Sequence, residues 1–273
     1  MSKKLLSGPY LLWMIGFTVI PLALIVFYGL TDRSGAFTLA NVLSIGTAEH
    51  RKALFLSLGL SLISTLVCLL LAYPLAMILR KRNIGKGSFV VFIFILPMWM
   101  NFLLRTYAWL PILGKNGFVN NFLANFGIGP IQFLYNDGAV LLGMVYNFLP
   151  FMVLPIFTIL SKMDQSLIDA ASDLGATRKQ IFTKVVFPLS LPGVLSGITM
   201  VFMPAVSTFV ISSLLGGGQY MLLGNLIEQQ FTTMGNRNFG SAISIIMMIV
   251  ILISMAVMNK FDSEDKEGSA GLW

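Results

Sequence analysis

The residues that usually carry out chemistry in proteins are scarce in this chain. It has one histidine, His50, and one cysteine, Cys68, so neither a disulfide nor a cysteine-based zinc site can form within it. A Ser/His/Asp triad would have to use His50, which lies in a polar stretch and which we interpret as a surface loop residue. We expect no catalytic residue and no metal site, and we predict that the chain itself is not an enzyme.

A phosphate-binding loop is also missing. The nearest candidate to a Walker A motif is Gly85-Lys86-Gly87-Ser88. That motif needs Gly five positions before Gly85, where Arg80 stands, and Ser or Thr directly after the lysine, where Gly87 stands. The run 216–218 does not fit G-x-G-x-x-G either, because position 221 is Met. We expect this chain to bind no ATP and no other cofactor itself.

One cation is expected inside an apolar segment. Asn101 and Arg105 are four residues apart, so on a helix they share a face. A charge within a membrane span is costly and usually faces the bundle interior or a cavity. Arg105 could instead lie near the membrane edge and extend towards water. We favour the first interpretation, in which Arg105 lines a pathway and holds a gate through hydrogen bonds.

Six apolar segments are long enough to span a membrane as helices, since one span needs about 20 residues. They cover residues 10–30, 53–79, 89–110, 139–160, 191–215 and 242–258. As helices they would satisfy their own backbone groups, and the alternating pattern of a membrane barrel is absent. The first segment is too long for a signal peptide, so we read it as an uncleaved anchor. Gly193 and Gly197 form a G-x-x-x-G pair that indicates close helix packing.

The composition agrees with an all-α membrane protein. Of 273 residues, 56% are hydrophobic and only 11% are charged, and the mean hydropathy is +0.85. A soluble domain carries about 25% charged residues, so a water-soluble globule is excluded, as is a disordered chain. None of the six segments contains Asp or Glu, which makes a self-sufficient proton- or sodium-coupled carrier less attractive. We expect residues 1–273 to form a single transmembrane domain.

The positive charges indicate how the chain is oriented, because short cytoplasmic loops are enriched in Lys and Arg. The side that holds both termini carries twelve cations and the other side five, which predicts cytoplasmic termini. The twelve are Lys3, Lys4, Arg80, Lys81, Arg82, Lys86, Lys162, Arg178, Lys179, Lys184, Lys260 and Lys266, and the five are Arg33, Arg51, Lys52, Lys115 and Arg237. The net charge of +7 is therefore a topology signal and no sign of nucleic-acid binding.

The loop 161–190, on the cytoplasmic side, is predicted to be a helix–turn–helix. Ser166 can cap a first helix, on which Leu167, Ala170, Ala171 and Leu174 form one apolar face. Gly175 would end that helix. Thr177 with Gln180 would form a capping box for a second helix, which Pro188 would end. An apolar face on an exposed loop needs a partner, unless the loop folds back on its own bundle.

This loop resembles the EAA motif of binding-protein-dependent ABC importer permeases. Asp169-Ala170-Ala171 is followed after three residues by Gly175 and after nine more by Val185, and Phe187-Pro188 completes the pattern. The family pattern has Glu, Ile and Leu where this chain has Asp169, Val185 and Phe187. The resemblance implies a type I ABC importer permease fold and a coupling helix that docks in a groove of an ATPase subunit. The implied coupling residues are Asp169, Ala170, Ala171, Ser172, Asp173, Gly175, Ala176, Thr177 and Arg178.

The resemblance extends over about residues 10 to 260 and is strongest to the B-type permease subunits of spermidine/putrescine importers. The stretches 96–107, 149–155 and 214–229 carry it. It implies polyamine import across the bacterial inner membrane. Aromatic faces and acids bind ammonium groups, so we expect the pathway to include Trp99, Tyr107, Trp109, Tyr146 and Glu228, together with Asn147. Each aromatic side chain could instead pack against lipid or anchor the chain at the membrane interface. Asn101 and Arg105, which share a helix face, complete the predicted pathway. Contact of Arg105 with a polyamine would be repulsive, so a gating or scaffold role is expected for it.

The partners implied are a second, similar permease, two ATPase subunits that hold ATP and magnesium, and an extracytoplasmic substrate-binding protein. An importer for another small solute is the first alternative. A stand-alone secondary carrier or channel is a more distant one, and the coupling loop distinguishes it from an importer.

Overall fold

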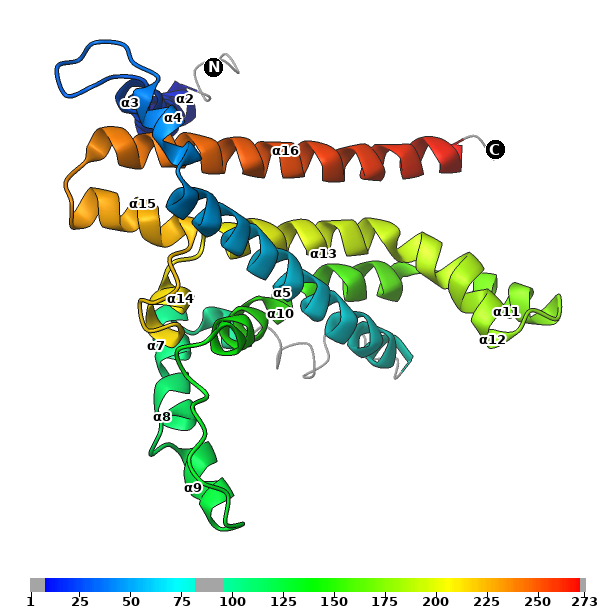
Figure 1. The fold of residues 1–273 in the computed structure, drawn as a ribbon. Coiled ribbons are helices and arrows are strands. Elements are labelled where there is room, and N and C mark those ends of the chain that lie inside the picture. The colour runs from blue at the N-terminus through cyan, green and yellow to red at the C-terminus, as the bar shows by residue number, and fades with distance from the viewer. Residues whose placement is uncertain (1–7, 82–95, 271–273) are drawn as a thin grey trace. The chain divides into compact units, whose positions relative to one another are not determined.

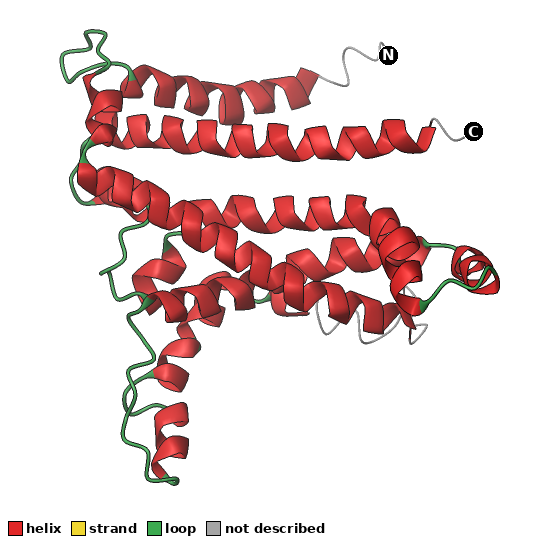
Figure 2. Ribbon diagram, turned by 45° about the vertical axis from the view of Figure 1, so that its right-hand side comes forward, coloured by secondary structure: helices red, strands yellow, loops and turns green. Residues whose placement is uncertain are grey.

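The structure is a computed structural model that describes residues 8–81 and 96–270 (Figure 1). Helices are the regular elements of this part of the chain, beside an isolated β-bridge between Thr31 and Phe37 (Figure 2). The prediction of an all-α protein is confirmed. Packing divides the chain into two units, residues 1–56 with 221–252 and residues 57–220 with 253–273.

Five helices of the described chain are long and apolar enough to cross a membrane. The first, Gly8–Gly29, joins α2 (Gly8–Met14), the π-helical turn η1 (Ile15–Val19) and α3 (Ile20–Gly29). The second is α5 (Ala48–Lys81) and the third is α10 (Asp137–Lys162). The fourth, Arg178–Ser207, joins α12 (Arg178–Ile181), η3 (Phe182–Val186) and α13 (Phe187–Ser207), and the fifth is Arg237–Met258 of α16 (Arg237–Ala270). They overlap five of the six predicted spans.

The remaining predicted span, 89–110, is not one continuous helix where the structure describes it. Residues 89–95 lie outside the described residues, and the helical backbone that follows is interrupted at Asn101. The Asn101 side chain accepts hydrogen bonds from the amides of Leu103 (2.9 Å) and Leu104 (3.3 Å), so it starts a new helix. Short helices follow, namely α7 (Phe102–Tyr107), α8 (Trp109–Leu113) and α9 (Phe118–Ala124).

The fifth predicted span differs at both ends, since its helix starts before Pro188 and ends at Ser207. Contrary to the prediction, Pro188 does not end the preceding helix, because η3 widens the backbone just before it. The amide of Phe187 donates to the carbonyl of Phe182, five residues earlier, and this π turn relieves the clash that proline makes in a regular helix. At the other end, Thr208 interrupts the chain before α14 (Val210–Leu215).

Helices α10 and α13 form the centre of the larger unit and lie side by side (Figure 1). The two glycines of the predicted close-packing pair lie at this contact. A Cβ atom on Gly193 would lie 2.9 Å from the Pro155 carbonyl oxygen, and one on Gly197 would lie 2.7 Å from the Met152 sulfur. Only glycine lets the two backbones approach this closely, which confirms the packing interpretation.

The smaller unit is built around the start of α16. Its buried apolar cluster joins Ile45, Ala53, Leu223, Leu226, Ala242 and Ile243, which include residues of α15 (Leu223–Thr232). Asn238 ties α16 to the end of α3 by donating to the carbonyls of Thr31 (2.7 Å) and Tyr28 (3.1 Å). His50 belongs to this unit too. It lies in the first turn of α5, half-buried against Phe239, so its predicted loop position is wrong and its contacts are structural.

Candidate functional site

The predicted helix–turn–helix is present between α10 and α13. Its first helix is α11 (Gln165–Asp173). The helix is capped by Asp164, whose carboxylate accepts a hydrogen bond from the Ser166 amide (3.0 Å), so Ser166 as the cap was wrong. Asp164 precedes the helix with an extended backbone, which is the conformation a cap needs. Hydrogen bonds from Ser166 hold the pKa of the Asp164 carboxyl below its usual value.

The turn after α11 is a Schellman motif closed by Gly175. The amide of Ala176 donates to the carbonyl of Ala171 (3.1 Å), and the amide of Gly175 donates to the carbonyl of Ser172 (2.9 Å). Gly175 has a φ of +81°, a left-handed conformation in which glycine is favoured. The prediction that Gly175 ends the helix is confirmed, and the turn depends on this residue.

The second helix, α12, starts with the predicted capping box. The Gln180 side chain accepts from the Thr177 amide (2.8 Å), while the Gln180 amide donates to the Thr177 hydroxyl (3.4 Å). Together the turn and the cap fix the angle at which α12 leaves α11. The two caps therefore make the loop a defined structure in spite of its exposed position.

The loop presents its residues to the outside. No residue of α11 is buried, and the Leu174 side chain at the turn is 88% exposed. Asp169 accepts a hydrogen bond from the Gln165 side chain (3.1 Å) within the same helix. Of the nine predicted coupling residues, Ala171 and Ala176 are half-buried and the other seven are exposed: Asp169, Ala170, Ser172, Asp173, Gly175, Thr177 and Arg178. A fixed helical loop with an apolar tip in the open is typical of a surface that binds a protein.

Arg105 lies at the centre of the second group of predicted residues. It is only 5% exposed, so it does not extend to the protein surface. Its Nη1 atom donates to the Pro97 carbonyl (2.6 Å), and its guanidinium carbon lies 6.0 Å from the centre of the Tyr146 ring. Its Nε atom is buried and has no hydrogen-bond partner among the described residues. Arg105 therefore fastens α7 to the chain before the break at Asn101.

Asn147 continues this group on α10. It is fully buried, and its Nδ2 atom donates to the Gly143 carbonyl (2.9 Å) and to the Thr106 hydroxyl (3.3 Å). Its Oδ1 atom has no partner among the described residues. The sequence reasoning missed both Thr106 and the Pro97 carbonyl. A backbone acceptor leaves no side-chain signal, whereas Thr106 is adjacent to Arg105 and could have been considered.

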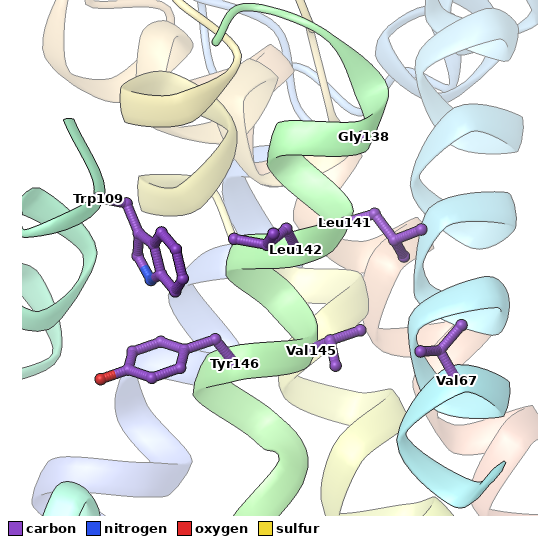
Figure 3. A pocket seen from close by; sticks show the side chains of 7 residues that line it. All are labelled: Val67, Trp109, Gly138, Leu141, Leu142, Val145 and Tyr146. Atoms are coloured by element: carbon purple, nitrogen blue, oxygen red, sulfur yellow. The ribbon is translucent and has the colours of Figure 1, made fainter. Parts of the chain in front are cut away.

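Two aromatic residues meet at the edge of an open cavity of about 390 Å³. The rings of Trp109 and Tyr146 lie 5.3 Å apart in an edge-to-face arrangement (Figure 3). The cavity is lined by Val67, Trp109, Gly138, Leu141, Leu142, Val145 and Tyr146 (Figure 3). This lining is almost entirely apolar and contains no acid, so a cation that entered it would meet aromatic faces and aliphatic groups.

The other predicted pathway residues are not part of this group. Asn101 caps α7, while Trp99 is 78% exposed and Tyr107 is 49% exposed. Glu228 belongs to the other packed unit, where its carboxylate accepts from the Thr232 hydroxyl (2.9 Å). The structure thus brings together Arg105, Trp109, Tyr146 and Asn147.

Comparisons with known proteins agree with this architecture. Residues 40–263 match the family described as "Binding-protein-dependent transport system inner membrane component". The chain is 36% identical over 253 residues to the spermidine/putrescine transport system permease protein PotB of Escherichia coli K12, which covers 90% of this chain and 92% of that protein. It is 35% identical to PotB of Haemophilus influenzae, with 90% and 88% covered. A solved structure of a bacterial alginate ABC transporter, in complex with an alginate pentasaccharide-bound periplasmic protein, has a similar fold, with a TM-score of 0.78 at 17% identity and 92% and 90% of the two chains covered.

Proposed function

This chain belongs to the family of binding-protein-dependent transport system inner membrane components, and from that membership we propose that it is the permease subunit of an ATP-driven importer of spermidine and putrescine. The observation that supports this substrate assignment is the 36% identity of the chain, along nearly its whole length, to a permease named for those two polyamines. The chain is a multi-pass protein of the inner membrane. Its own part in import is to form half of the pathway.

The loop that contains α11, the Gly175 turn and α12 is the ATPase docking element in this proposal. Three observations support it. The loop is fixed by caps at both helices, it buries no residue of α11 against its own chain, and it exposes Leu174 at its tip. An exposed leucine on a rigid helical turn suits a groove on another protein, because its burial there removes apolar surface from water. Movement of the ATPases would then reach the membrane helices through α10 and α13.

The substrate pathway is proposed to run past Trp99, Asn101, Arg105, Tyr107, Trp109, Tyr146, Asn147 and Glu228. Trp109 and Tyr146 offer aromatic faces to an ammonium group. Arg105 has the opposite effect, since a buried guanidinium repels a polyamine. Its hydrogen bond to Pro97 supports a gating role, in which it holds the broken segment before α7 in place.

The full importer is proposed to contain a second homologous permease, two ATPase subunits and an extracytoplasmic binding protein. The ATPase subunits would bind ATP and magnesium, and this chain would bind neither. Its termini are proposed to lie in the cytoplasm, in keeping with the excess of Lys and Arg on that side.

Uptake by proteoliposomes that contain all the subunits tests this function. We expect radiolabelled spermidine to accumulate only when ATP and the binding protein are present, and unlabelled putrescine to compete with it. An assembled complex that hydrolyses ATP but does not accumulate either polyamine would overturn the substrate assignment. Uptake by this chain without any ATPase subunit would overturn its assignment as an importer subunit.

A further inference from the structure

The π-helical turn η3 lies between the proposed docking loop and the long helix α13. We treat it as a weak point of the helix, because its amides bond five residues back instead of four, as the Phe187 amide does to the Phe182 carbonyl. Pro188 adds to this weakness, since it has no amide to donate to the preceding turn. A force applied at α12 could therefore bend the chain at η3 before it moved α13.

One residue of another helix packs across this turn. The ring of Tyr73, on α5, lies 5.8 Å from the ring of Phe182 at an interplanar angle of 90°, and 6.0 Å from the ring of Phe187. The two phenylalanine rings are 6.2 Å apart, so the three form a closed cluster. Phe182 is the first residue of η3 and Phe187 directly follows its last, so Tyr73 contacts the two ends of the turn. The edge-to-face pair of Tyr73 and Phe182 stabilises this contact beyond its buried area.

The hydroxyl of Tyr73 adds a directed hydrogen bond. It lies 2.8 Å from the hydroxyl of Ser190, which is fully buried. The Ser190 hydroxyl donates its one proton to the Phe187 carbonyl (2.8 Å), which can only accept. For both contacts to be hydrogen bonds, Tyr73 must donate to Ser190. A short chain of hydrogen bonds thus runs from α5 through Ser190 to the backbone that begins α13.

We infer that Tyr73 is a positioning residue that clamps η3, so that movement of the docking loop is passed to α13 and α5 instead of being absorbed at the π turn. This inference rests on the proposed docking role of α11 and α12. It assigns to Tyr73 an effect on the coupling between ATP hydrolysis and transport. Tyr73 itself contacts neither the ATPase nor the substrate in this scheme.

The variants Tyr73→Phe and Ser190→Ala, alone and together, test the inference in the reconstituted complex. The first removes one hydroxyl and keeps the ring cluster. We expect Tyr73→Phe to lower the number of polyamine molecules imported per ATP by about 2- to 10-fold, the effect of one hydrogen bond. Ser190→Ala also removes the bond to the Phe187 carbonyl, so it should lower the ratio at least as much. The double variant should resemble Ser190→Ala, because that substitution already breaks the bond between Tyr73 and Ser190. Tyr10→Phe, on α2, where Tyr10 is 64% exposed, is the matched control and should leave the ratio unchanged.

A second measurement distinguishes loss of the Tyr73 clamp from general unfolding and from failure of the proposed function. Amide hydrogen exchange of the full chain in the assembled complex should become faster in residues 182–190 of Tyr73→Phe and stay the same in residues 165–174. If the unaltered complex does not import polyamines, the proposed function fails. If it does, and Tyr73→Phe leaves both the import ratio and the exchange unchanged, the clamp is overturned. A variant that only lowers the amount of complex, with uptake and ATP hydrolysis falling in proportion, also overturns it.

Discussion

Replacing Gly175 tests whether the turn between α11 and α12 docks on the ATPase, because the free-energy cost of the substitution can be worked out from the backbone conformation. A Cβ atom placed on Gly175 meets no heavy atom within 4 Å, so alanine causes no clash within this chain. Docking requires the φ of +81°, which costs an L-residue about 1–2 kcal/mol, and the free loop of the variant can avoid that cost by leaving this conformation. We therefore expect Gly175→Ala to weaken association with the ATPase subunits about 5- to 30-fold, and to lower ATP-dependent uptake in step.

Asparagine at the same position separates two explanations of such a loss. Asn tolerates the left-handed conformation better than other side chains, so Gly175→Asn should bind the ATPase more tightly than Gly175→Ala if the turn conformation decides. If instead a side chain at this position collides with the ATPase surface, asparagine is the larger residue and should bind more weakly. The order of the two variants therefore identifies the cause.

The assay is a titration of membrane-embedded chain with purified ATPase subunit, with uptake measured on the same preparations. Gly127 supplies the control, because its φ is +72° and a Cβ there also meets nothing within 4 Å. Gly127→Ala should carry a similar backbone penalty and leave ATPase association unchanged. Equal binding by Gly175→Ala and the unaltered chain would refute the docking role of the turn.

Three further substitutions probe other parts of the chain. Thr177→Ala removes the cap of α12 and should lower the stability of that helix by about 1 kcal/mol, seen as faster amide exchange in residues 178–186. Gly197→Ala places a methyl group 2.7 Å from the Met152 sulfur and should lower the free energy of unfolding by about 1–3 kcal/mol, measured by denaturation in detergent. Arg105→Ala leaves the Pro97 carbonyl without this donor and should lower the melting temperature of the purified chain, whereas unchanged melting would show that the bond contributes little.

The elements that could be predicted from the sequence are those that depend on local signals. The apolar runs that became α5 and α10 are continuous, and the Thr177 capping box and the Gly175 turn each rest on residues three to five apart. The cap of α11 was misplaced by two residues, because Asp164 and Ser166 are both good caps and the backbone before the helix decides between them. Composition alone does not contain that information.

The features that could not be predicted depend on contacts between distant residues. The break at Asn101 lies in a run that reads as an uninterrupted span, and only the cap bonds to Leu103 and Leu104 reveal a new helix start. The partner of Arg105 is a backbone carbonyl eight residues earlier, which no pattern of side chains marks. Tyr73 meets Ser190 across 117 residues of sequence, so its role could be found only from the folded chain.

The π turns also affect how the helix surfaces should be read. The two π turns of the described residues occur just before a proline, η1 ahead of Pro21 and η3 ahead of Pro188, and each fits one more residue into its turn than an α-helix does. One residue corresponds to about 100° of rotation around the helix axis. Side chains of α13 are therefore rotated by about a quarter of a turn from the positions that an uninterrupted α-helix starting at α12 would give them. A helical wheel drawn through residues 178–207 as a single α-helix would assign the wrong residues to the inner face of one half.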